Sequence, residues 1–162
     1  MRSAPQRGFT LIELVVVIII LGVLAAFAVP RFMGLDQQAR IASVNSLVGT
    51  LQSASAMAHG VWLAQGAPAA PITIDGQAIT FTFGYPNNAS IAKLLAAGTV
   101  TANGLAGTFK NPAAGTFQLN GAPTPANCEV TYQAPAAANT EPTITTVPAN
   151  LGSGNPQITG GC

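Results

Sequence analysis

The residues that could carry catalytic chemistry are few in this chain, and they lie far apart. His59 is the only histidine, so a Ser-His-Asp or Cys-His mechanism would have to use it. It falls in a predicted helix, and no acidic residue lies three or four positions away on the same face. Four carboxylates are scattered singly, without the spacing of a calcium-binding loop: Asp36, Asp75, Glu129 and Glu141. We therefore expect a structural histidine, no metal or other cofactor, and no enzyme.

The fifth carboxylate, Glu13, lies inside an apolar run of twenty-one residues from Phe9 to Val29. As a helix, this run would measure about 32 Å, close to the roughly 30 Å hydrocarbon core of a bilayer. A charged side chain at the centre of a membrane helix costs about 2.5–3.5 kcal/mol, and less near the end. We therefore expect Glu13 to have a partner.

The residues around Glu13 resemble the N-terminus of type IV prepilins. In residues 7–13 (RGFTLIE), a short basic leader ends with Gly8 and is followed by Phe9, and Glu13 is the fifth residue counted from Phe9. The resemblance implies that a prepilin peptidase cuts between Gly8 and Phe9 and that Phe9 is N-methylated. It also implies that Glu13 of one subunit meets the new ammonium group of the next, which would remove most of the cost of burying either charge.

The resemblance continues at Gly22 and Pro30, where pilins commonly carry the same residues and where assembled filaments often unwind the helix. Glycine weakens a helix interior and proline removes a hydrogen bond, so at least a kink is expected at Pro30. Residues 29–33 and 35–40 are similar to the mannose-sensitive haemagglutinin branch of the type IVa pilins.

Two other interpretations of the N-terminus stay open. The basic leader and the Ala-Phe-Ala sequence at 26–28 could belong to a secretory signal, although its apolar core usually has 7–15 residues. The run could also be an uncleaved single-span anchor. N-terminal sequencing would separate the three, since the mature chain would begin at Phe9, Val29 or Met1.

Cys128 and Cys162 are the only cysteines. An even number in an exported domain favours a disulfide, and oxidising compartments preserve such bonds. The resemblance implies the same pairing, because similar pilins close a C-terminal loop in this way. Free thiols and metal ligation are the alternatives.

The hydrophobic pattern becomes periodic after Pro30, which predicts an amphipathic helix that continues the apolar run. We predict one helix from Phe9 to about Gln65, ended by Gly66. Trp62, with Met57 and Leu63, is expected in the core. The periodic apolar positions are Ile41, Val44, Leu47, Val48, Leu51, Ala54, Ala58, Val61 and Trp62.

The remainder of the chain predicts short strands and turns. Ile72–Ile74 and Ala78–Phe83 flank Asp75-Gly76, a type I′ hairpin signal. A short helix is expected over Ile91–Ala97, capped by Asn88 or Ser90 and closed by Gly98. Further strands are predicted at Thr116–Leu119, Glu129–Gln133 and Thr143–Val147.

The composition excludes a basic surface for nucleic acid, since the net charge is only +1. Charged residues make up 7% of the chain, against about 25% in typical soluble proteins. Such a surface suits a subunit that buries much of itself against copies of itself.

These observations predict an α+β pilin fold, with a long helical spine on a small antiparallel sheet and a C-terminal disulfide loop. The predicted segments are a leader (1–8), an apolar helix half (9–30), an amphipathic half (31–66) and a β-rich head (67–162). The resemblance implies a type IV pilus subunit that passes from the bacterial inner membrane into a surface fibre for adhesion or twitching motility. Its partners would be copies of itself, the peptidase, the assembly machinery and lipid. The alternatives are a type II secretion pseudopilin, although major ones typically carry an acidic calcium loop, or a minor membrane-anchored pilin that binds a surface.

Overall fold

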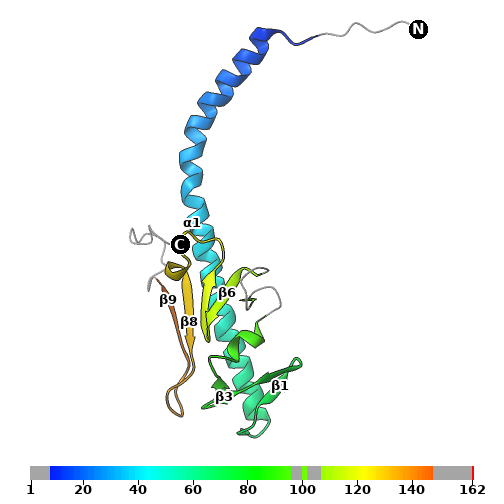
Figure 1. Ribbon diagram of the computed structural model, residues 1–162, viewed down its shortest axis with the longest axis vertical. Coiled ribbons are helices and arrows are strands. Elements are labelled where there is room, and N and C mark those ends of the chain that lie inside the picture. The colour runs from blue at the N-terminus through cyan, green and yellow to red at the C-terminus, as the bar shows by residue number, and fades with distance from the viewer. Residues whose placement is uncertain (1–7, 96–99, 102–106, 148–161) are drawn as a thin grey trace, which may run out of the picture. The chain divides into compact units, whose positions relative to one another are not determined.

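The computed structural model describes residues 8–95, 100–101, 107–147 and 162. A single long helix, α1 (Leu11–Ala64), is followed by short strands and two 3-10 helices (Figure 1). The chain divides into two compact units, Met1–Gln37 and Gln38–Cys162, so that α1 contributes to both. The predicted α+β architecture, with a long helix and small sheets, is confirmed.

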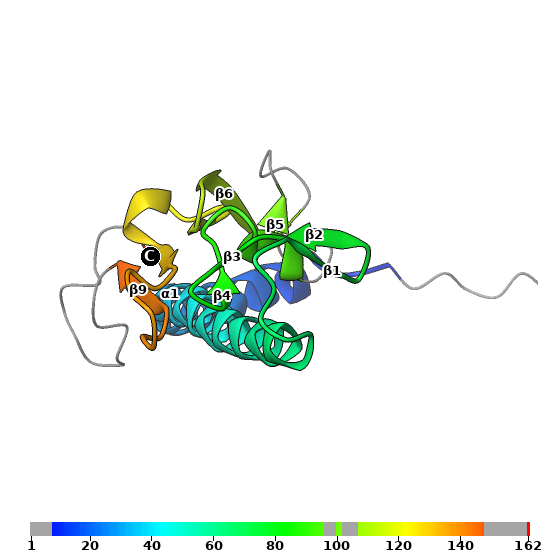
Figure 2. The same ribbon diagram turned by 90° about the horizontal axis from the view of Figure 1, so that it is seen from below.

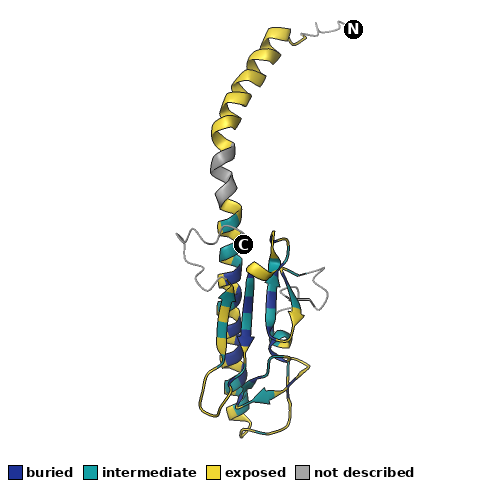
Figure 3. Cartoon of the chain, turned by 60° about the vertical axis from the view of Figure 1, so that its left-hand side comes forward, coloured by how far each residue is buried: buried dark blue, intermediate teal, exposed yellow. Residues whose placement is uncertain are grey.

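The first unit contains the apolar half of α1. The window Leu11–Ala28 has a mean hydropathy of 3.0 and none of it is buried, so it is long and apolar enough to cross a membrane (Figure 3). The helix is continuous through Gly22 and Pro30. The expected unwinding concerns the assembled fibre, for which it stays a prediction.

The second unit begins with the amphipathic half of α1, which lies beside the strands (Figures 1 and 2). Its buried residues recur every three or four positions, as the sequence predicted: Val44, Leu47, Leu51, Ala54 and Ala58. Met57 and Leu63 are 52% and 56% exposed, so their expected place in the core is wrong. At about 100° per residue they point away from the buried face, whereas Trp62 lies near it and is half-buried.

A five-stranded sheet in the order β5-β6-β7-β8-β9 covers this face of α1. All neighbouring pairs are antiparallel except the short parallel pair β5–β6, which the sequence did not predict. Phe117, Val130 and Tyr132 are fully buried and pack with Leu47 and Leu51. The strands are β5 (Val100–Thr101), β6 (Phe109–Ala113), β7 (Thr116–Leu119), β8 (Glu129–Gln133) and β9 (Thr143–Val147).

Two small hairpins precede the sheet. β1 (Ile72–Ile74) and β2 (Gln77–Ile79) join through Asp75 and Gly76, whose positive φ angles of 48° and 75° are those of the predicted type I′ turn. The predicted strand Ala78–Phe83 is wrong as one element. It is divided at Thr80, whose N–H donates to Ser90 Oγ at 3.0 Å, and β3 (Phe81–Thr82) then pairs with β4 (Tyr85–Pro86).

The predicted helix over Ile91–Ala97 is a shorter 3-10 helix, η1 (Ile91–Leu94). Of the two expected caps, Ser90 does lie at the N-cap position, but its Oγ accepts from Thr80 N and makes no capping hydrogen bond. Asn88 is not the cap, and its Oδ1 accepts from Ala134 N. Asn87 Oδ1 accepts from Ser90 N at 2.8 Å and so supports the turn that leads into the helix. Gly98 lies outside the described residues. A second 3-10 helix, η2 (Pro125–Asn127), precedes β8.

The turn between β6 and β7 depends on a glycine. Gly115 has φ +82° and its carbonyl accepts from Tyr132 N at 2.7 Å. A Cβ at this position would collide with the Tyr132 carbonyl oxygen. The Tyr132 hydroxyl donates to Pro86 O at 2.7 Å, which ties the sheet to the β3–β4 hairpin, and burial raises the pKa of this hydroxyl above its ordinary value.

Candidate functional site

The Gly8–Phe9 bond lies before the first helical residue, Leu11. Phe9 is 89% exposed, so a protease could reach this bond without unfolding the helix. A Cβ on Gly8 would have no heavy atom within 4 Å. The described residues therefore give no steric reason for glycine at this position.

Thr10 and Glu13 form a capping box at the beginning of α1. Thr10 N donates to Glu13 Oε2 at 2.9 Å, and the Thr10 hydroxyl donates to the same oxygen at 2.8 Å. Glu13 N lies 3.4 Å from Thr10 Oγ1, the reciprocal contact of this motif. The two residues thus satisfy backbone N–H groups that would have no partner in the first turn of a helix.

The sequence-based prediction did not name Thr10 as a partner of Glu13. The signal was present, because Thr-Leu-Ile-Glu before an apolar run matches the capping-box pattern. Both hydrogen bonds from Thr10 go to Glu13 Oε2, and Oε1 makes none to a described residue, so one oxygen of the carboxylate is left for a second partner. The carboxylate can therefore hold its own helix end and still accept from a cation.

The side chains around this box are exposed and apolar, among them Leu11, Ile12 and Leu14. No described side chain in the first unit covers them, since the whole window Leu11–Ala28 is unburied. Burial of this surface would have to come from lipid or from another protein chain.

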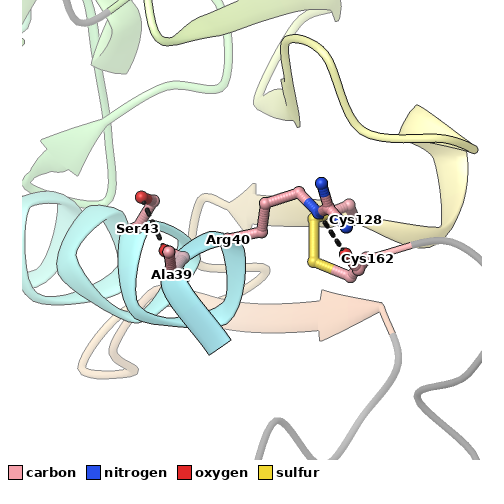
Figure 4. Close-up of a disulfide and its surroundings, with 5 residues drawn as sticks. All are labelled: Ala39, Arg40, Ser43, Cys128 and Cys162. Carbon is pink, nitrogen blue, oxygen red and sulfur yellow. Dashed lines mark hydrogen bonds between the residues drawn. A yellow bond between two sulfur atoms is a disulfide. The ribbon is translucent and has the colours of Figure 1, made fainter. Parts of the chain in front are cut away.

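The predicted disulfide between Cys128 and Cys162 is present, with both residues buried and a Cα–Cα distance of 4.8 Å. Cys128 immediately precedes β8. Arg40, on the amphipathic half of α1, donates through Nε to the carbonyl of Cys162 (Figure 4). The bridge and this hydrogen bond fasten Cys162 to both the sheet and the helix.

His59 makes contacts typical of a packed residue. Its Nδ1 lies 2.8 Å from the carbonyl oxygen of Gly84, and its ring stacks on Tyr85 at a centroid distance of 4.2 Å. Glu129 accepts from Gln118 and Thr131 within the sheet. The described residues include no group of three His, Cys, Asp or Glu side chains placed to hold a metal ion.

Residues 3–29 match the prokaryotic N-terminal methylation motif. This match contains Gly8, Phe9 and the Thr10–Glu13 box, which are the residues singled out by the geometry above.

Three named relatives each align with part of the chain. The type IV narrow pilus major component PilA5 of Thermus thermophilus is 52% identical over 52 residues, 32% of this chain and 45% of the relative. The type II secretion system core protein G of Klebsiella michiganensis is 48% identical over 54 residues, 33% and 38% of the two chains. The fimbrial protein EcpC of Eikenella corrodens is 33% identical over 105 residues, 63% and 65% of the two chains.

The chain therefore spans less than two thirds of the length of these relatives. No solved structure matches the chain significantly. The motif and the relatives support the resemblance to type IV pilins, whereas the narrower resemblance to the mannose-sensitive haemagglutinin branch stays a prediction.

Proposed function

Because the chain carries the prokaryotic N-terminal methylation motif and is similar to type IV pilins, we propose that it is a structural subunit of a type IV pilus. One observation carries this proposal: an unburied apolar helix, Leu11–Ala28, begins with a carboxylate that keeps one oxygen without a described partner. Such a helix needs a membrane and then a polymer to cover it.

In this proposal a prepilin peptidase cuts between Gly8 and Phe9 and methylates the new N-terminus. Cleavage creates an ammonium group on Phe9, one residue before the capping box. The exposed position of the bond and the absence of a structural need for Gly8 support this step.

The precursor waits in the bacterial inner membrane, from which assembly machinery extracts it into a fibre on the cell surface. Apolar helices exchange lipid for one another, so little hydrophobic free energy is gained and packing decides the arrangement. Glu13 of one subunit accepts from the ammonium group of the next, which sets the register because a mispaired pair would leave two buried charges. Gly22 and Pro30 allow the helix to adjust in the fibre.

The four segments proposed from the sequence are defined by their roles, so their bounds differ from those of the two compact units. Residues 1–8 are removed, 9–30 form the fibre core, 31–66 hold the head, and 67–162 form the head surface. The compact units divide at Gln37–Gln38, which lies within the third segment.

The second candidate is a pseudopilin of a type II secretion system, favoured by the similarity to core protein G. A third is a minor or membrane-anchored pilin that acts by binding a surface. The share of the chain in sheared surface fibres separates these roles, since only a major pilus subunit would dominate them.

The experiment is to shear the fibres from cells, purify them and sequence the N-terminus of the main component. We expect a chain that begins with N-methylated Phe9 and accounts for most of the fibre mass. A mature chain that begins at Met1 or Val29, or that is missing from fibres, would overturn the proposal.

A further inference from the structure

Two adjoining cavities lie on one side of the second unit, between α1 and the connection from β8 to β9. The larger measures about 550 Å³ and the smaller about 330 Å³, within the range of small-ligand sites. Tyr85 and Glu141 line both cavities, so the two form one groove with these residues at its centre.

Three rings at the groove are held in place by their neighbours. His59 stacks between Tyr85, at 4.2 Å and nearly parallel, and Trp62, at 5.8 Å. The carbonyl oxygen of Gly84 lies 2.8 Å from His59 Nδ1, and Trp62 Nε1 donates to Pro68 O at 3.0 Å. His59 Nδ1 and Trp62 Nε1 therefore have partners within the fold, which fixes the two rings and prearranges the aromatic surface for a ligand.

Phe83 adds an exposed aromatic side chain under backbone strain. It lines the larger cavity, is 51% exposed and has φ +49°. A bulky residue in the left-handed region is strained, and such strain is concentrated at functional sites. Gly84 follows with φ +86°, and a Cβ there would lie 2.8 Å from the Trp62 ring, so the turn must approach the ring closely.

Glu141 supplies a negative charge that has no partner among the described residues. It is exposed, and it makes no hydrogen bond or ion pair with a described residue. Neither cavity is lined by a lysine or an arginine among the described residues. The groove therefore combines aromatic rings with a carboxylate that no described cation neutralises.

Ring faces and a carboxylate attract the same kind of ligand, an organic cation. The negative face of an aromatic ring attracts a cation, and the attraction is stronger where the site excludes water. We propose that this groove binds an organic ammonium group, with Tyr85 and Trp62 supplying ring surface and Glu141 the opposite charge. The site does not depend on the fibre role, so failure of either proposal leaves the other intact.

Trp62 gives a direct readout because it is the only tryptophan in the chain. The full-length protein, in a polyoxyethylene detergent without charge or sugar, is titrated with choline while tryptophan fluorescence is followed. The comparison ligand is 3,3-dimethyl-1-butanol, which has the shape of choline without its charge. Chemical shifts of the ligand methyl groups provide a second measurement, since stacking on rings moves them upfield.

We expect saturable binding of choline with a dissociation constant on the order of millimolar, and binding of the neutral analogue about tenfold weaker. Glu141→Gln should weaken choline binding several-fold without affecting the neutral analogue. Tyr85→Leu should weaken both. Asp75→Asn is the matched control, because it removes the same charge at a residue outside the groove where asparagine tolerates the positive φ.

The same titration with a trimethyl-lysine derivative tells whether the groove prefers a modified protein side chain or a small molecule such as choline. Tighter binding of either ligand supports the proposal. Equal affinity for the neutral analogue, or unchanged affinity in Glu141→Gln, would overturn it. So would saturable binding of a methyl glycoside without binding of choline, or no saturable response by either measurement. Unchanged circular dichroism and melting temperature would show that each variant is folded.

Discussion

The two interactions proposed for Glu13 can be separated by substitution. Glu13→Gln keeps an oxygen that can accept from Thr10 N, since glutamine also forms capping boxes, but it removes the charge needed by the neighbouring ammonium group. Thr10→Ala removes the hydroxyl contacts at 2.8 and 3.4 Å and keeps the charge. Glu13→Ala removes both interactions.

The expected magnitudes differ enough to decide between them. Loss of one partner from a buried ion pair costs about 3–5 kcal/mol, which corresponds to roughly a hundred- to several-thousand-fold in subunit association. Loss of an N-cap side chain costs about 1 kcal/mol, or roughly fivefold. Glu13→Gln should therefore nearly abolish fibres, while Thr10→Ala should reduce them several-fold.

The assay measures sheared fibre protein relative to membrane-held subunit by quantitative immunoblotting of the same cells. All three variants should remain in the membrane at normal levels and lose the leader, which shows that the block lies in assembly. Normal fibres from Glu13→Gln, together with their loss in Thr10→Ala, would show that Glu13 acts by capping its own helix and would refute the pairing between subunits.

Four further outcomes follow from the structure. Gly8→Glu should block processing, so mass spectrometry should find a chain that keeps its eight leader residues, whereas Gly22→Ala serves as a control that leaves the cleavage site unchanged. Gly115→Ala should destabilise the head by more than about 2 kcal/mol, because it combines a positive φ with a collision against Tyr132 O. Urea unfolding would measure the loss of stability. An unchanged unfolding midpoint would contradict this reasoning. Cys162→Ser should lower stability by about 3–4 kcal/mol on the chain-entropy model, measured as a lower melting temperature under non-reducing conditions. The pKa of Tyr132 is higher in the folded chain than in the unfolded chain. Above about pH 10 the unfolded chain therefore loses this proton while the folded chain keeps it, so the stability of the fold falls as the pH rises. Tyr132→Phe should lessen this fall between about pH 9 and 11, as measured by thermal melts.

The elements predicted correctly are those with a strong local signal. The spacing of Val44, Leu47 and Leu51 predicted the buried face of α1, and Asp75-Gly76 predicted the first hairpin turn. β-branched runs predicted β8 and β9 with their observed bounds. In each case the local preference and the tertiary contacts favour the same structure.

The missed elements have weak or conflicting signals. β6 contains Asn111 and Pro112, residues that are depleted in strands, and it forms because β7 pairs with it. The strand expected over Ala78–Phe83 is divided by a hydrogen bond from Thr80 to Ser90, a contact that local sequence does not specify. The tertiary partner decided both outcomes.

The candidate sites follow the same rule. Gly8, Phe9 and Glu13 are adjacent in the sequence and match a known motif, so they could be identified without a structure. The groove brings together His59 from α1, Tyr85 from β4 and Glu141 from the connection before β9. Segments so far apart in the chain are joined only by the fold, and no pattern in the sequence could have revealed their proximity.

The continuity of α1 has a mechanical consequence. The same helix holds the unburied apolar window and, further along, the residues packed under the sheet. In a fibre under tension, force that reaches the second unit along α1 would be carried by the contacts of Leu47 and Leu51 with the sheet. Those contacts would be loaded in shear and would have to break at the same time, so the sheet would resist being pulled away from α1.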